Sequence, residues 1–284
     1  MEAMTGGILA ETLDDLGRSA RTWREPVLVE RVVVGLFFTG VKLANGHAGV
    51  CYTPVKSIPE AVCCPSSAMA MPLPGKMRGR DALELAAEGL GKGILQKALA
   101  IAILNALSST CFALGTPGGW DFRPGVDPVD ALALEEGARV VVVGALVPYL
   151  RRLKARGRPF HVLEQDPAAL KADELPFFVP AQRAGDIVPQ ADVLVVTGST
   201  LLNGTCEGLL EMAREDAEIV VVGPTSSLLP GALFRRGVQV VAGIRITQPD
   251  TLLDLLAEGG SGSHMFGRTA EKVANYNRDP RRRA

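Results

Sequence analysis

Short apolar runs alternate with helical patterns along the second half of the sequence, and this alternation restricts the fold more than any other feature. The runs are rich in β-branched residues and cover residues 138–143, 160–163, 192–196, 218–222 and 238–241. Runs without strict polar alternation indicate strands buried on both faces, which is typical of a parallel sheet. Helical patterns separate or follow them at residues 147–156, 203–214, 230–236 and 249–258. The second half is therefore predicted to be a doubly wound α/β domain.

The first 115 residues show a different order of elements. We expect an amphipathic helix first, then three strands, then two helices, at residues 8–20, 27–34, 36–44, 47–52, 79–90 and 93–113. Asn45-Gly46 separates the last two strand patterns and is a strong hairpin signal, because both positions of its usual turn need a positive φ. The sequence predicts an antiparallel meander followed by helices, which is an α+β domain.

A stretch rich in glycine and proline separates these two parts. The sequence from Gly115 to Pro128 contains four glycines and three prolines, too many for a helix or a central strand. We place the domain boundary there, which gives an α+β domain at 1–115, a doubly wound domain at 116–270 and a C-terminal tail at 271–284. Two domains also agree with a length of 284 residues.

Composition and charge exclude several classes of function. Thirty basic and 31 acidic residues leave a formal charge of -1, so no global field attracts nucleic acid or anionic lipid. Five cysteines do not make a disulfide framework, and the acidic start lacks the basic region of a signal peptide, so we expect a reduced, cytoplasmic protein. Polar residues interrupt the uncharged stretch between Lys97 and Asp121, which favours a buried helix over a membrane span. We expect a small-molecule partner, and association into homo-oligomers stays open.

The loops that follow the predicted strands are where ligands bind in an open parallel sheet. Gly144 makes a single glycine turn before a predicted helix, and Glu164 follows the next strand 20 residues later. An acid at this spacing can hold the ribose hydroxyls of an adenosine-type ligand such as S-adenosylmethionine. The G-x-G-x-x-G fingerprint is absent, which argues against NAD binding of the usual kind. The alternative is that Glu164 only ends a strand.

Hydroxyl-bearing residues are concentrated in two further loops, Thr197 to Thr205 and Gly223 to Ser227. Hydroxyls and backbone amides at a helix entrance can form a cradle for a polar or anionic ligand. Helix capping explains one Ser or Thr in each loop but not this density, so we favour a ligand site. We place Asn203 at the entrance of a helix, where its amide can contact the ligand. No His or Lys lies nearby in the sequence, so nucleophilic catalysis is not indicated.

A polar stripe crosses the uncharged helix, because Asn105, Ser108 and Ser109 share one helical face. Such a stripe on a buried helix needs hydrogen-bond partners. Either it satisfies the backbone of the first domain, or it faces the second domain and completes a cleft between the two. The sequence leaves both alternatives open.

Metal-ligand motifs are scarce in this chain, which contains no C-x-x-C and no H-E-x-x-H. Cys63-Cys64, with Met69, Met71 and Met77 downstream, could bind a soft metal, although adjacent cysteines are as easily ordinary small residues. Cys206 lies inside the polar loop, but a lone cysteine is most often structural. A structural zinc site is not expected.

Two long segments carry a resemblance to a known family. ADVLVVTGSTLLNGTCEGLLEMA and VVVGPTSSLLPGALFRRGVQVVAGIRITQPDTLLDLLAEGG resemble the signature of a prokaryotic family labelled a putative heavy-metal chelation domain. The resemblance covers most of residues 120–270. It implies a Rossmann-like domain preceded by a domain similar to the small N-terminal domain of enolase, with a cleft between them. It implies no enolase chemistry, because the catalytic barrel and its metal ligands are missing.

The resemblance also implies a set of ligand-binding positions. They are Asn105, Gly144, Pro148, Glu164, Thr197, Gly198, Ser199, Thr200, Asn203, Thr205, Gly223, Pro224, Thr225 and Ser226. A metal held within an organic chelator would need polar loops rather than thiolates. Two functions therefore stay open. The cleft binds a small anionic ligand or a metal chelate, or it belongs to an enzyme that uses S-adenosylmethionine or an adenine nucleotide.

Overall fold

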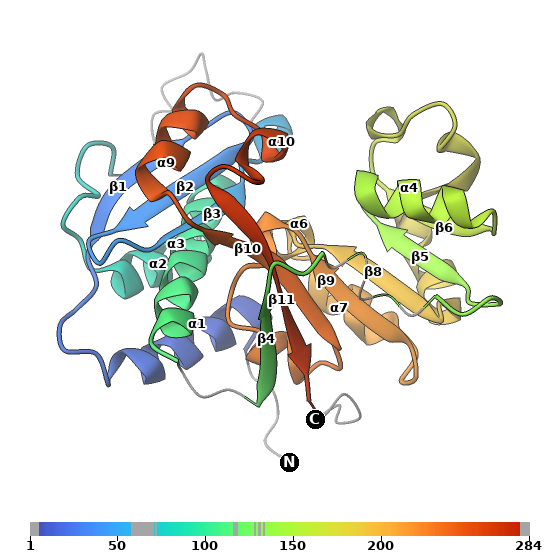
Figure 1. Ribbon diagram of the computed structural model, residues 1–284, viewed down its shortest axis with the longest axis horizontal. Coiled ribbons are helices and arrows are strands. Elements are labelled where there is room, and N and C mark those ends of the chain that lie inside the picture. The colour runs from blue at the N-terminus through green and yellow to red at the C-terminus, as the bar shows by residue number, and fades with distance from the viewer. Residues whose placement is uncertain are drawn as a thin grey trace.

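An eight-stranded sheet, in which parallel pairing predominates, forms the centre of the second half of the chain (Figure 1). The computed structural model describes residues 6–57, 71, 73–115, 119–127, 129, 132 and 134–278. In sequence order the strands are β4 (Trp120–Pro124), β5 (Val140–Val143), β6 (Phe160–Glu164), β7 (Phe178–Pro180), β8 (Val193–Thr197), β9 (Glu218–Val222), β10 (Val240–Ile246) and β11 (Ala270–Asn277). Their order across the sheet is β4-β11-β10-β9-β8-β5-β6-β7. Strand β11 runs opposite to the other seven strands, so its pairs with β10 and β4 are antiparallel and all other pairs are parallel.

The six parallel strands define where a ligand can bind. Counted from β5 as the first, their order is 3-2-1-4-5-6, so the direction in which the sheet grows reverses between β5 and β8. The helices of this half are α4 (Val147–Arg156), α5 (Ala184–Ile187), α6 (Ser199–Asn203), α7 (Cys206–Met212), α8 (Gly231–Phe234), α9 (Pro249–Ala257) and α10 (Gly262–Met265). The prediction of an α/β fold with a largely parallel sheet is confirmed.

A smaller antiparallel sheet forms the N-terminal unit. Its elements are α1 (Ile8–Ala20), β1 (Val29–Val34), β2 (Phe38–Leu43), β3 (Ala48–Tyr52), the short 3-10 helix η1 (Val55–Ser57), α2 (Ala82–Leu90) and α3 (Ile94–Ala113). Helix α3 packs against β3, and α9 from the second half of the chain packs against β1 and β2. Gly40 faces α9 and Gly49 faces α3, so the two helices cover opposite faces of this sheet.

The turn at Asn45-Gly46 differs from the one expected. Gly46 has a φ of 86°, but no described residue other than glycine has a positive φ, so Asn45 does not. The Gly46 amide donates to the Leu43 carbonyl at 2.9 Å, and the Leu43 amide donates to the His47 carbonyl at 2.8 Å. These bonds define a longer hairpin loop that needs only one glycine in the left-handed region.

Three strands were not predicted. The predicted tail, 271–284, begins with residues that belong to β11, which pairs with β10 from Val240 to Ile246. The predicted boundary at 115–128 contains β4, an edge strand that ends at Pro124, where a missing amide is tolerated. Strand β7 has only three residues. Their sequences carry charges or proline, so neither alternation nor an apolar run marks them.

The two units share one hydrophobic core. A single cluster of buried side chains contains Ile101 and Leu104 of α3 together with Leu194 and Val196 of β8. By length and composition α3 could cross a membrane, but 72% of its apolar window is buried inside the protein. The prediction of a buried helix is therefore confirmed.

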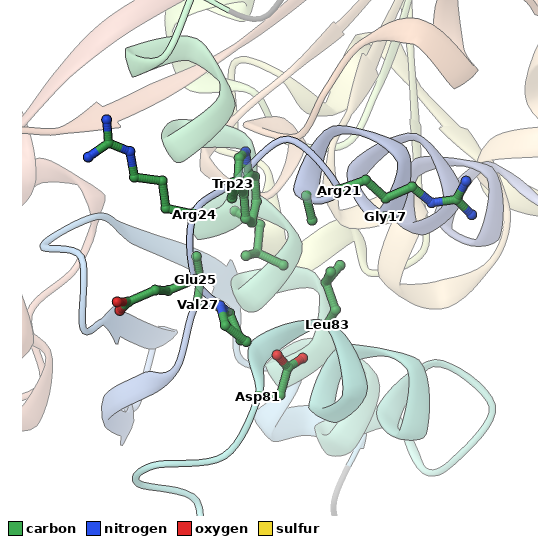
Figure 2. A pocket seen from close by; sticks show the side chains of 11 residues that line it. Gly17, Arg21, Trp23, Arg24, Glu25, Val27, Asp81 and Leu83 are labelled. Atoms are coloured by element: carbon green, nitrogen blue, oxygen red, sulfur yellow. The ribbon is translucent and has the colours of Figure 1, made fainter.

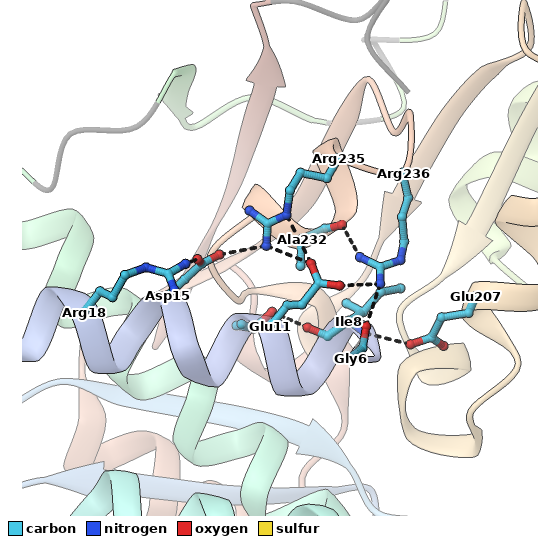
Figure 3. Close-up of polar contacts among 10 residues, drawn as sticks. Gly6, Ile8, Glu11, Asp15, Arg18, Glu207, Ala232, Arg235 and Arg236 are labelled. Carbon is cyan, nitrogen blue, oxygen red and sulfur yellow. Dashed lines mark hydrogen bonds and ion pairs between the residues drawn. The ribbon is translucent and has the colours of Figure 1, made fainter. Parts of the chain in front are cut away.

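Ion pairs also fasten α1 to the second unit (Figure 3). The Glu11 carboxylate accepts hydrogen bonds from Arg236 at 2.6 Å and from Arg235 at 2.9 Å. The Ile8 amide donates to the Glu207 carboxylate of α7 at 2.8 Å. The hydrogen bond from Arg236, assisted by Arg235, holds the pKa of Glu11 below its ordinary value against the opposing effect of burial.

We expect Glu11→Gln to lower the free energy of unfolding by about 1–2 kcal/mol at neutral pH, because it leaves Arg236 half-paired in a site that is mostly buried. Since the pKa of Glu11 is depressed in the folded state, its contribution is present above the unfolded pKa and is lost as pH falls through the folded pKa. Urea unfolding of both proteins between about pH 7 and about pH 3 measures this difference, which should shrink on acidification.

Glu136→Gln is the matched control, because Glu136 pairs with Arg158 while its side chain is 86% exposed. It should change stability by less than about 0.5 kcal/mol. Equal effects of the two substitutions would show that the pair on α1 contributes no more than a surface pair.

Candidate functional site

A cavity of about 790 Å³ lies between the N-terminal unit and the carboxyl ends of β5, β6, β8 and β9. We call this cavity the cleft. It is placed where the growth of the sheet reverses, which is where ligands bind in doubly wound sheets. The predicted site residues that line it are Gly144, Glu164, Thr197, Gly198, Ser199, Thr200, Asn203, Thr205, Gly223, Pro224 and Thr225. Asn105, Pro148 and Ser226 do not line it.

The N-terminal unit supplies a wall that the sequence analysis missed. Phe38, Tyr52, Pro54, Lys56 and Ile94 line this side of the cleft. They come from β2, the end of β3, the segment that follows it and the first residue of α3. No sequence motif marks them, because only the packing of the small sheet against the large one brings them to the strand ends.

Glycine is required at the turn after β5. Gly144 has a φ of 94°, and a Cβ atom there would lie 2.8 Å from Cγ2 of Thr197. Both the backbone conformation and the close approach of β8 therefore exclude larger residues. The turn brings the loops after β5 and β8 together at the cleft.

The Glu164 carboxylate links the loops after β5 and β6. It accepts hydrogen bonds from the backbone amides of Ala145 at 3.0 Å, Gln165 at 2.7 Å and Asp166 at 3.3 Å. A carboxylate has about four acceptor positions, so these three amides occupy most of them. A ribose diol would have to displace backbone bonds, and the geometry favours a positioning role for Glu164.

An ion pair spans the cleft between Lys56 and Asp166. The two side chains approach to 2.7 Å, and the second Asp166 oxygen accepts from the Ala168 amide at 3.0 Å. The hydrogen bond from Lys56 lowers the pKa of Asp166, and the same bond raises the pKa of Lys56. The charged side chains that line the described part of the cleft are thus all engaged with other groups.

Much of the 197–205 loop is occupied by its own hydrogen bonds. The Thr200 hydroxyl donates to the Thr197 carbonyl at 2.7 Å, and the Ser199 hydroxyl donates to Oγ1 of Thr197 at 3.2 Å. Asn203 lies at the end of α6, not at the entrance of a helix as predicted, and its Oδ1 accepts from the amide and hydroxyl of Thr205 at 3.1 and 2.7 Å. These bonds shape the turn before α7 and use the oxygen of Asn203, a residue that lines the cleft.

The 223–227 loop is hydrogen-bonded to neighbouring strands. The Ser226 hydroxyl donates to the carbonyls of Gly223 at 2.9 Å and Ala242 at 2.8 Å, and only 1% of Ser226 is exposed. Oγ1 of Thr225 accepts from the Tyr52 amide at 3.0 Å, which joins the two walls of the cleft. Ser226 therefore stabilises the loop. It does not lie in the cavity wall, where the predicted ligand-binding role would place it.

The polar stripe on α3 makes hydrogen bonds both within its own unit and to the second unit, so both alternatives from the sequence hold in part. The Asn105 amide nitrogen donates to the Val50 carbonyl of its own unit at 2.7 Å and to the Thr225 carbonyl of the other at 3.0 Å. Oγ of Ser108 accepts from the Leu229 amide at 2.8 Å, while Ser109 contacts His47 of its own unit. Asn105 is 1% exposed, so it ties the units together beneath the cleft and does not face a ligand.

The remaining predicted residues do not assemble a metal centre. Within the described ranges no three His, Cys, Asp or Glu side chains come together. Cys51 and Cys206 are buried free thiols, and burial raises the pKa of Cys206 to about 12. Pro148 is exposed in the first turn of α4. Cys63-Cys64 and Met69 lie outside the described residues.

A second cavity, of about 340 Å³, lies beside the end of α1 (Figure 2). Figure 2 shows Arg21 and Arg24 pointing away from it in different directions. The Asp81 carboxylate in its wall accepts from the Glu84 amide at 3.0 Å and caps α2. Its charged groups thus point outward or stabilise a helix, and the cleft is the better candidate site.

Comparison with known protein families shows the family to which this chain belongs. The family model DUF364, described as "Putative heavy-metal chelation", matches residues 127–275, more than half of the chain. The chain belongs to this family. A second model with the same description, DUF4213, matches residues 14–108 of this DUF364 protein. The resemblance drawn from the two sequence segments is confirmed.

Two solved DUF364 structures share the fold. A protein with unknown function from Pyrococcus horikoshii is 21% identical, with a TM-score of 0.74 over 94% of this chain and 99% of that one. Another from Desulfitobacterium hafniense DCB-2 is 18% identical, with a TM-score of 0.67 over 93% and 98%. An uncharacterized protein from Methanocaldococcus jannaschii is 26% identical over 180 residues, which are 63% of this chain and 65% of that relative.

Proposed function

We propose that the cleft binds a metal that is already held by a small organic chelator. One observation carries this proposal: the cleft has a volume of about 790 Å³, but no group of three metal-ligating side chains occurs in the described part of the chain. A metal in such a site must bring its own ligands. The family description, heavy-metal chelation, points to the same class of cargo.

The chemistry of the walls supports an organic ligand over a simple inorganic anion. Lys56 is paired with Asp166, and the Glu164 carboxylate is used by backbone amides. Uncharged polar residues such as Asn203 and Thr205 line the wall, alongside Phe38 and Tyr52. Neutral donors and apolar surfaces suit the polar atoms and carbon frame of an organic molecule.

The strand order supports the same location. The 3-2-1-4-5-6 order is that of Rossmann-like domains, which hold ligands at the reversal point. We assign the second unit to this class and the first to the enolase N-terminal-like class. The same order would also suit S-adenosylmethionine, but the occupied carboxylate of Glu164 disfavours a ribose there.

Two measurements test the proposal directly. Protein purified without a histidine tag is analysed for bound metal and for small organic molecules by mass spectrometry. Its melting temperature is then measured with ferric and nickel complexes of organic chelators, with the free metals and with S-adenosylmethionine. We expect stabilisation by a complex beyond that given by its free metal. Stabilisation by S-adenosylmethionine alone would contradict the proposal.

We expect Asn203→Ala to weaken binding of a stabilising chelate several-fold while lowering stability by about 1 kcal/mol, because the bonds from Thr205 to its side chain are lost. Asn45→Ala is the matched control, because Oδ1 of Asn45 also accepts from an amide two residues ahead, in a hairpin loop that does not line the cleft. Titration calorimetry compares the two variants with wild type. Equal affinities in all three would show that Asn203 only stabilises the turn before α7.

A further inference from the structure

Lys97 is a half-buried cation without a counter-charge. Among the described residues Lys42, Lys97, Lys154 and Lys272 are partly buried lysines. Three of them form ion pairs with carboxylates. In the described part of the chain the Lys97 ammonium has neither a carboxylate nor a carbonyl within hydrogen-bond distance. Burying an unpaired ammonium is unfavourable, so a lysine at this half-buried position needs a physical reason.

The stability of α3 does not explain why a lysine occupies position 97. It is the fourth residue of α3, near the positive end of the helix dipole, where a cation is disfavoured. Lys97 acts electrostatically on Cys51, a fully buried thiol whose pKa is raised by burial in spite of that cation. The thiol is therefore neutral and does not balance the ammonium.

The position of Lys97 relates it to the cleft. Its Nζ lies 3.8 Å from where a Cβ of Gly204 would be, and Gly204 forms part of the cleft wall. Ile94, one helical turn earlier on α3, also lines the cleft. Gly204 has no side chain and a φ of 76°, so at this position no side chain lies between the ammonium and the cleft wall.

We propose that Lys97 is a ligand-contacting residue of the cleft, and that its ammonium receives an anionic oxygen group on the organic part of the chelate beside Gly204. This inference rests on the proposed function and deepens it, because it selects chelates that carry a free or exposed acidic group. A flexible four-carbon stem lets the ammonium turn past a glycine without moving the helix. Lys97 then supplies the positive charge that the paired Lys56 does not offer.

Two iron complexes, one with exposed carboxylates and one without charge, test this assignment. Ferric citrate presents carboxylates, whereas ferric tris-acetohydroxamate is uncharged. We expect Lys97→Met to weaken binding of ferric citrate by about tenfold or more, with little change for the hydroxamate complex. Lys97→Arg should restore citrate binding to within about threefold, and added salt should weaken that binding in wild type and Lys97→Arg but much less in Lys97→Met.

Lys92→Met is the matched control, because Lys92 is exposed just before α3 and lines a different groove. The melting temperature of each variant is also measured. Removal of an unpaired half-buried charge should leave that of Lys97→Met unchanged or raise it, whereas a structural role would lower it. Acetylation of the Lys97 amine, followed by mass spectrometry, should slow in the presence of ferric citrate.

The outcomes separate the two proposals. If wild type binds ferric citrate and Lys97→Met binds it equally well, the assignment of Lys97 is wrong and the proposed function stands. Equal weakening of both complexes would also overturn the assignment, since it would mean a general disturbance of the cleft. If wild type binds no metal complex at all, the proposed function fails and the role of Lys97 fails with it.

Discussion

Gly49→Ala should destabilise the protein by about 3 kcal/mol, among the largest losses expected for a single added methyl group. A Cβ atom at Gly49 would lie 2.3 Å from the Ala106 amide nitrogen and 2.4 Å from the Ala102 carbonyl oxygen. Both are backbone atoms of α3, so no side-chain rotation can make room. The helix would have to move away from β3, which loosens the core that both units share. Urea unfolding of the full chain measures this loss.

Gly17→Ala provides a control with the opposite sign. Gly17 lies within α1, and a Cβ atom there would meet nothing within 4 Å. Alanine should therefore stabilise the helix by about 0.5–1 kcal/mol. A similar loss of stability in the two variants would mean that contact with α3 does not determine the effect at Gly49.

Asn105→Ala should lower the free energy of unfolding by about 2–3 kcal/mol, because it removes a donor from two buried carbonyls and leaves a small cavity. The carbonyls belong to Val50 and Thr225, one on each side of the junction between the units. Oδ1 of Asn105 has no partner among the described residues, so its removal offsets part of this loss. Chemical denaturation gives the stability, and calorimetry with a bound chelate gives the affinity.

Ser109→Ala is the comparison for this position, because Ser109 lies one turn further on α3 and contacts only His47 at 3.3 Å. It should cost less than about 1 kcal/mol. If Asn105→Ala instead leaves stability intact and abolishes binding, then Asn105 contacts the ligand, as the family resemblance implies, and its role as a tie between the units is wrong.

Regular elements with clear local signals could be predicted closely. Helix α1 was predicted at its observed bounds because its apolar residues recur at helical spacing, and α4 because Gly157 ends it in the left-handed region. Strand β11 could not be predicted, since AEKVANYN has neither alternation nor an apolar run. It forms because β10 offers it an unpaired edge, which is a property of the folded sheet.

Part of the candidate site could also be predicted from the sequence, and part could not. Loops after parallel strands converge by topology, so Gly144, Glu164 and the 197–205 loop were found from the sequence alone. The opposite wall was not found, because Phe38 and Tyr52 reach the site only through packing of one sheet on another. Spacing also could not show that the Glu164 carboxylate is used by three backbone amides.

The hydrophobic core that the two units share affects how the ligand that we propose would enter the cleft. Widening the cleft by a hinge motion would separate α3 from the sheet and expose apolar surface, at about 25 cal/mol for each Å². It would also break the bonds of Asn105 to Thr225 and of Ser108 to Leu229. If the cleft binds a chelate as we propose, we expect it to keep a nearly constant width and to exclude complexes too bulky for about 790 Å³.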